Sequence, residues 1–174
     1  MSKTTIEFSL NATSINKAIR ELEKHKQDVI RKSELFRKRV AEKISDYSAS
    51  GFNGAIVDDI TAKSGGARMA NVSMSIEDGD GVSIVIANGE DAVWVEFGAG
   101  VYHNGAAGSS PNPYGQELGF TIGGYGTNGT KKTWGFYEGD QLIITHGTPA
   151  TMPMYNAVQR VVQDMATIAR EVFG

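Results

Sequence analysis

Cysteine is absent from this chain of 174 residues, and proline occurs only four times. Without cysteine the chain has no disulfides, no thiolate zinc sites and no thiol nucleophile. Long apolar runs are also missing: no window approaches the ~20 residues that cross a membrane, and the N-terminus shows no signal-peptide pattern. We therefore expect no membrane partner and assembly in the cytoplasm.

Charge is unevenly distributed along the chain. The net charge of -3 combines a stretch at residues 13–45, with ten basic and five acidic residues (+5), and a remainder that carries -8. Surfaces of opposite sign favour self-association or docking on a charged partner, although a solvated helix face would also explain the basic stretch. The length and the 40% hydrophobic content indicate one globular domain over residues 1–174.

A long amphipathic helix is predicted early in the chain. Thr13 or Ser14 would cap it, and it should end by Gly51. Its apolar residues recur at helical spacing: Ile15, Ile19, Leu22, Val29, Phe36, Val40, Ile44 and Tyr47. Because Lys26 and Ser33 interrupt this stripe, the helix bends, breaks near residues 25–28, or faces a partner there.

Strand patterns fill most of the remaining chain. Alternation predicts strands at residues 5–10, 55–62, 71–77 and 82–87, and a second hairpin at 134–138 and 142–145. Residues 78–81 (Asp-Gly-Asp-Gly) are a strong hairpin turn. Residues 91–97 are short enough to be a strand or one helical turn.

A second amphipathic helix is predicted to begin at Pro153, which suits a first turn. Its apolar stripe consists of Met154, Val158, Val161, Met165, Ile168 and Val172. The sequence thus predicts an α+β fold: an antiparallel β-sheet packed by a long N-terminal helix and a C-terminal helix, with a long glycine-rich loop.

The glycine-rich excursion covers residues 98–133. Between residues 98 and 147 lie 13 of the 21 glycines. A connection of this length without periodicity is usually functional or disordered. Aromatic residues spaced among its glycines suit a surface that orders on contact, so we take Tyr102, Tyr114, Phe120 and Tyr125 as a candidate interface.

Motifs for catalysis and cofactors are weak. Gly124, Gly126 and Gly129 match a dinucleotide pattern, but no helix follows them to bind a phosphate. His25, His103 and His146 lack metal-ligand spacing, so we expect neither a metal nor a cofactor.

Glu96 is the carboxylate that stands out, because it lies within an apolar stretch. We expect it to accept hydrogen bonds from backbone amides of the adjacent glycine turn. A small hydrolase using Glu96 and His146 remains an alternative function.

Two short signatures flank the glycine-rich segment. The first contains Trp94, Glu96, Phe97, Gly98 and Gly100, and the second contains His146, Gly147, Pro149, Ala150, Pro153 and Tyr155. With the element order around them, these signatures resemble the tail-component family of long-tailed bacteriophages, the tail-completion or neck proteins that join tail to head.

The resemblance implies a structural virion protein rather than an enzyme. It implies a homo-oligomeric ring, expected to be a hexamer, in the neck of a phage or prophage particle. Its expected neighbours are a head-closure or connector protein and a tail-terminator or tail-tube protein. Alternatives are a tail-terminator ring and, from the +5 stretch, a nucleic-acid-binding module that uses the basic helix. No sequence-specific nucleic-acid partner is expected.

Overall fold

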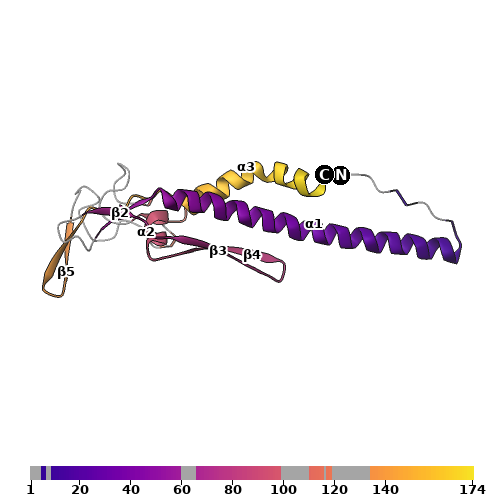
Figure 1. Ribbon diagram of the computed structural model, residues 1–174, viewed down its shortest axis with the longest axis horizontal. Helices are drawn as coiled ribbons and strands as arrows, with labels where there is room; N and C mark the ends of the chain where they lie inside the picture. Colours follow the sequence, from indigo (N-terminus) through magenta and orange to yellow (C-terminus); the bar gives the residue numbers. More distant parts are fainter. Residues whose placement is uncertain (1–4, 7–8, 60–65, 99–109, 116, 119–133) are drawn as a thin grey trace.

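A computed structural model describes residues 5–6, 9–59, 66–98, 110–115, 117–118 and 134–174 (Figure 1). The fold is α+β, as predicted. Its elements are α1 (Ala12–Asn53), β1 (Ile56–Asp58), β2 (Ala67–Met69), β3 (Ser73–Gly79), β4 (Val82–Asn88), α2 (Asp91–Phe97), β5 (Trp134–Glu138), β6 (Gln141–Thr145) and α3 (Pro153–Phe173). The glycine-rich segment lies largely outside the described residues, as do Gly100, Tyr102, Phe120 and Tyr125.

Helix α1 is continuous over 42 residues, so of the three alternatives for its interrupted stripe the break near residues 25–28 does not occur. Its cap is Asn11, whose Oδ1 accepts from the amide of Ser14 at 2.9 Å, rather than Thr13 or Ser14. The amide of Ser9 donates to Ser14 Oγ at 3.0 Å. The strand predicted for residues 5–10 is not formed at its described members, residues 5–6 and 9–10, which belong to none of the three strand pairs.

Helix α3 packs antiparallel along the C-terminal half of α1 (Figure 1). Tyr47 donates to Asp164 at 2.9 Å, and the rings of Phe36 and Phe173 lie 6.0 Å apart. The last residues of α3 therefore meet α1 near Phe36. Residues 12–32 of α1 extend past α3 (Figure 1), a projection of about 30 Å at 1.5 Å per residue.

The strands form three separate antiparallel pairs rather than the single predicted sheet: β1 with β2, β3 with β4, and β5 with β6. Both predicted hairpins are confirmed, with two-residue turns at Asp80–Gly81 and Gly139–Asp140. Asp80, Gly81 and Gly139 have positive φ, which such turns favour. Strand β2 was not predicted.

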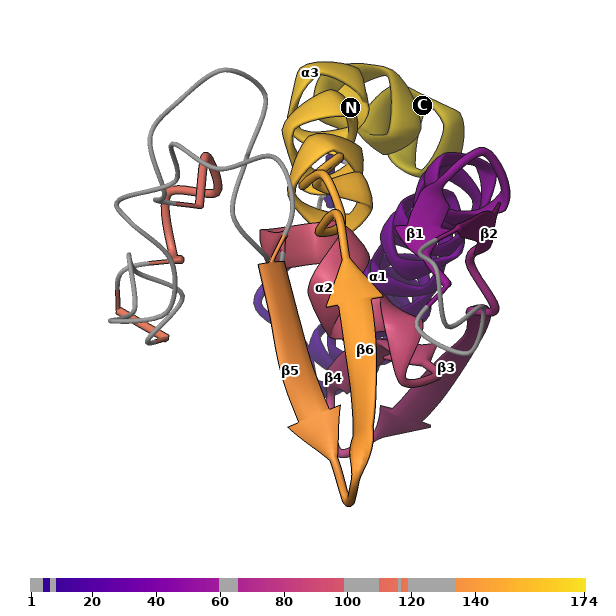
Figure 2. The same cartoon turned by 90° about the vertical axis from the view of Figure 1, so that its left-hand side faces the viewer.

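The main core lies where the C-terminal end of α1 meets α2 and the short strands. It contains Phe52, Ala55, Val57, Ala92 and Val95, all buried. Figure 2 shows α2 below the first turns of α3, with the β5–β6 hairpin extending away from both helices. Residues 91–97, which sequence left open between strand and helix, are therefore a helix that closes this core.

Candidate functional site

The two signatures meet at the junction between α2 and α3. The carbonyl of Val95 accepts from the amides of Thr151 and Met152 at 2.9 and 3.3 Å. Met152 precedes the helix in a left-handed conformation, and its side chain makes no capping hydrogen bond. The start of α3 is therefore stabilised by residues of α2.

Glu96 supplies the missing cap of α3. Its Oε2 accepts from the amide of Met154 at 2.8 Å, and its Oε1 accepts from the amide of Tyr155 at 3.0 Å. These are orphan amides of a first helical turn, and the partial positive charge there favours a carboxylate. Pro153, at the preceding position, has no N–H to satisfy.

Glu96 accepts hydrogen bonds from backbone amides, as predicted, but the predicted donors were wrong. The amides belong to the first turn of α3 rather than to the glycine turn beside Glu96. A third donor, Asn112 Nδ2, reaches Oε1 at 2.8 Å. Burial raises the pKa of Glu96, and the hydrogen bonds from Met154, Tyr155 and Asn112 oppose that rise.

Gly98 and Gly147 mark the points where the chain leaves each signature. Gly98 has φ 80° and ψ 155°, and its amide donates to the carbonyl of Trp94 at 2.7 Å. Gly147 has φ 81°. Both glycines therefore adopt backbone conformations that side chains disfavour, as expected from sequence.

The second signature is attached to β1 through Asp58. The backbone amide of His146 donates to Asp58 Oδ2 at 3.0 Å, and the imidazole Nδ1 of His146 lies 3.7 Å from Asp58 Oδ1. The amide of Asp58 in turn donates to the buried hydroxyl of Thr148 at 3.1 Å. In the described part of the chain, the contacts of His146 go to Asp58 rather than to Glu96, so the pair needed for a hydrolase is not joined.

A largely apolar cavity of about 430 Å³ adjoins Glu96. Its walls come from α2, α3 and the described part of the glycine-rich segment: Phe97, Asn112, Tyr114, Leu118, Met154, Tyr155, Val158 and Gln159. Tyr114 is the described member of the candidate aromatic interface, and its ring packs edge-on against Tyr155 at 6.3 Å. The described part of the glycine-rich segment, including Tyr114, therefore lies next to the α2–α3 junction.

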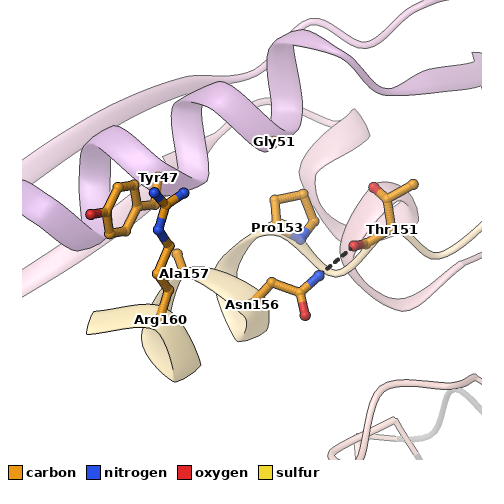
Figure 3. Close-up of a pocket in the computed structure, with 7 residues that line it drawn as sticks. All are labelled: Tyr47, Gly51, Thr151, Pro153, Asn156, Ala157 and Arg160. Atoms are coloured by element: carbon orange, nitrogen blue, oxygen red, sulfur yellow. Dashed lines mark hydrogen bonds between the residues drawn. The ribbon is translucent and has the colours of Figure 1, made fainter. Parts of the chain in front are cut away.

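A smaller cavity of about 150 Å³ lies where α1 meets the start of α3 (Figure 3). The guanidinium of Arg160 lies over the ring of Tyr47 at 3.9 Å, and Asn156 donates to the carbonyl of Thr151 at 2.9 Å. Gly51 faces Pro153 so closely that an added Cβ would lie 2.9 Å from the proline Cβ. The tight approach of the two helices explains the glycine at the end of α1.

An ion pair between buried Asp91 and exposed Arg68, which the sequence did not predict, fixes the other end of α2. Asp91 accepts from Arg68 at 2.6 and 2.8 Å and from the amide of Asn71 at 2.8 Å. The Arg68 guanidinium holds the pKa of Asp91 below its usual range, and burial partly offsets this. The signal in the sequence was an aspartate in a first helical turn, but its partner 23 residues away could not be identified.

We expect Asp91→Asn to lower the free energy of unfolding by about 2 kcal/mol at neutral pH, because it weakens two charged hydrogen bonds. A depressed folded-state pKa contributes stability above the unfolded pKa, and this stability is lost as pH falls through the folded value. The difference from wild type should therefore shrink in acid. Denaturant unfolding over a pH series measures it, with exposed Glu138→Gln as the control. A difference that does not vary with pH would contradict the assignment.

Among the described residues, no group of three or more His, Asp or Glu side chains gathers as a metal site. No helix among them has the length and apolarity to cross a membrane.

Comparison with known protein families, curated proteins and solved structures finds no match.

Proposed function

We propose that this chain is a structural protein of the neck of a long-tailed bacteriophage or prophage particle. Copies form a ring, expected to be sixfold, that completes the tail and joins it to the head. The neighbours would be a head-closure or connector protein and a tail-terminator or tail-tube protein. The ring would assemble in the host cytoplasm and remain in the virion.

The observation that carries this proposal is the α2–α3 junction. Residues from both signatures meet there through hydrogen bonds, and the one buried carboxylate of the first signature accepts from Met154, Tyr155 and Asn112. Residues of the two signatures that resemble the phage family thus connect α2 to α3. This use of Glu96 favours a scaffold over the hydrolase alternative.

The distribution of ion pairs bears on the nucleic-acid alternative. Among the ten basic residues of the basic stretch, Arg31, Lys32, Arg37, Lys38 and Arg39 form ion pairs with acidic side chains of the same chain. Charges paired in this way are less available to phosphates. The pairs therefore favour protein contacts over a nucleic-acid-binding role for α1.

Gene disruption tests the proposal. In the phage or prophage that carries this gene, its loss should leave filled heads and separate tails that fail to join, and the wild-type chain supplied in trans should restore particles. Negative-stain microscopy of the lysate is the measurement. Tails of uncontrolled length would instead indicate the tail-terminator alternative.

A further inference from the structure

The β3–β4 hairpin has two apolar faces. Its register pairs Met74 with Ala87 and Ile76 with Val85, and Met74 and Ala87 pack against the core. Since directly paired residues share a face, the other face is formed by Ser73, Ser75, Glu77, Val82, Ile84, Ile86 and Asn88. We call this the outer face of the hairpin.

Apolar residues on the outer face are partly or largely exposed. Val82 and Ile84 are 56% and 52% exposed, and Ile86 is partly buried. Single exposed apolar residues are common, but three in a row on one strand form a continuous ridge. Such a ridge indicates a surface that another element covers.

A second surface with exposed apolar side chains lies on α1. The segment 12–32, which we call the overhang, extends past the end of α3 and past the tip of the β3–β4 hairpin (Figure 1). Its stripe continues the face that carries Phe36, and its apolar members are 37–57% exposed: Ile15, Ile19, Leu22 and Val29. The stripe therefore runs beyond the helix that covers its C-terminal half.

The two surfaces carry opposite charge. The overhang contains six basic and three acidic residues, a net charge of +3, whereas the outer face carries one acidic and no basic residue. Of the other two acidic residues of the hairpin, Asp78 lies on the inner face near Arg37 and Lys38, and Asp80 lies in the turn. Within the stripe the charged residue is Lys26, and on the outer face it is Glu77. Neither makes an ion pair within the described residues.

We propose that the overhang of one copy packs across the outer face of the β3–β4 hairpin of a second copy, with Lys26 beside Glu77. Two overhangs would bring like charges together, and so would two outer faces, so pairing between unlike surfaces is favoured. A contact between different surfaces repeats from copy to copy and can close into a ring. The inference thus deepens the proposed ring and rests on it for its biological role.

Contacts within the chain show that this kind of packing suits the hairpin. Helix α1 lies against its inner face, where Arg37 and Lys38 approach Asp78 at 3.8 and 3.7 Å. The ridge from Val82 to Ile86 is about 13 Å long, and two helical turns of the stripe, Ile15 to Leu22, cover about 10 Å. The hairpin would then lie between two helices, its own α1 and the overhang of the neighbour.

The absence of cysteine makes a direct cross-linking test possible. Leu22→Cys carrying a size tag is mixed with untagged Ile84→Cys and treated with a short bis-maleimide. We expect the mixed dimer in severalfold excess over that from the matched control, tagged Leu22→Cys with Tyr137→Cys, because Tyr137 is exposed on the other hairpin. Mixed product no greater than this control, or mainly Leu22→Cys homodimer, would overturn the proposal.

Charge reversal provides a second readout on the same contact. Lys26→Glu and Glu77→Lys should each weaken self-association in sedimentation velocity, and the double variant should recover it. Lys24→Glu, on the opposite side of the helix by its two-residue offset, is the matched control. If the double variant does not recover, Lys26 and Glu77 are not partners. A failed cross-link with normal neck assembly would reject this interface alone, whereas normal particles after gene disruption would reject the function.

Discussion

Replacing Glu96 with alanine is expected to lower the free energy of unfolding by about 3 kcal/mol or more. The substitution leaves the amides of Met154 and Tyr155 without their acceptor at the start of α3, and it removes the partner of Asn112. Each buried, unsatisfied polar group costs about 1–3 kcal/mol. Glu96→Gln should cost less, because its one carbonyl oxygen still accepts.

Urea unfolding followed by circular dichroism measures this effect. Glu90→Ala is the matched control, because Glu90 is exposed and makes no side-chain capping hydrogen bond on α2. Its effect should stay within about 0.5 kcal/mol, as for most surface substitutions. Equal effects of the two alanine variants would show that the carboxylate does not hold α2 and α3 together.

Replacing Gly98 with alanine is expected to cost about 2–3 kcal/mol. The φ of 80° and ψ of 155° place Gly98 in a backbone region that is essentially restricted to glycine. The residue is buried, and its amide closes α2 through the carbonyl of Trp94, so the chain cannot relax freely. A side chain there should disturb the exit from the first signature.

Gly54→Ala is the control for this prediction. Gly54 follows α1 with φ -96°, and an added Cβ would meet no atom within 4 Å. We expect Gly54→Ala to change stability by less than about 1 kcal/mol. Thermal unfolding of the two variants compares them, and a Gly98 variant as stable as the Gly54 variant would show that the backbone there is not constrained.

Local patterns predicted the elements whose determinants are close in sequence. The stripe of α1, the start of α3 at Pro153 and the turns at Asp80–Gly81 and Gly139–Asp140 depend on residues within a few positions of one another. The predicted cap of α1, Thr13 or Ser14, was wrong because several residues near Asn11 can serve as caps, and only the backbone geometry selects one. Periodicity alone could not separate strand from helix at α2.

Long-range pairings were not predictable from one sequence. Strand β2 has three residues, too few for a periodic signal, and its register with β1, Asp58 with Ala67 and Ile56 with Met69, has no marker in the sequence. The separation of the strands into three pairs also depends on tertiary contacts. The backbone amides that donate to Glu96 are 58 and 59 residues away, so sequence indicated that it binds amides but not which ones.

The register of the β3–β4 hairpin, which decides the proposed interface, was also not predictable from the sequence. Strict alternation in the strands predicted at residues 71–77 and 82–87 puts Met74 and Ile76 on one face of the first, and Val82, Ile84 and Ile86 on one face of the second. The register puts these two sets on opposite sides of the hairpin. The ridge on the outer face therefore became visible only once the pairing was known.

Electron microscopy of particles made without this chain tests the neck assignment most directly. The assignment predicts DNA-filled heads and tails of normal length that remain unjoined, with joining restored by the wild-type chain in trans. Intact, infectious particles in the absence of the chain would contradict it.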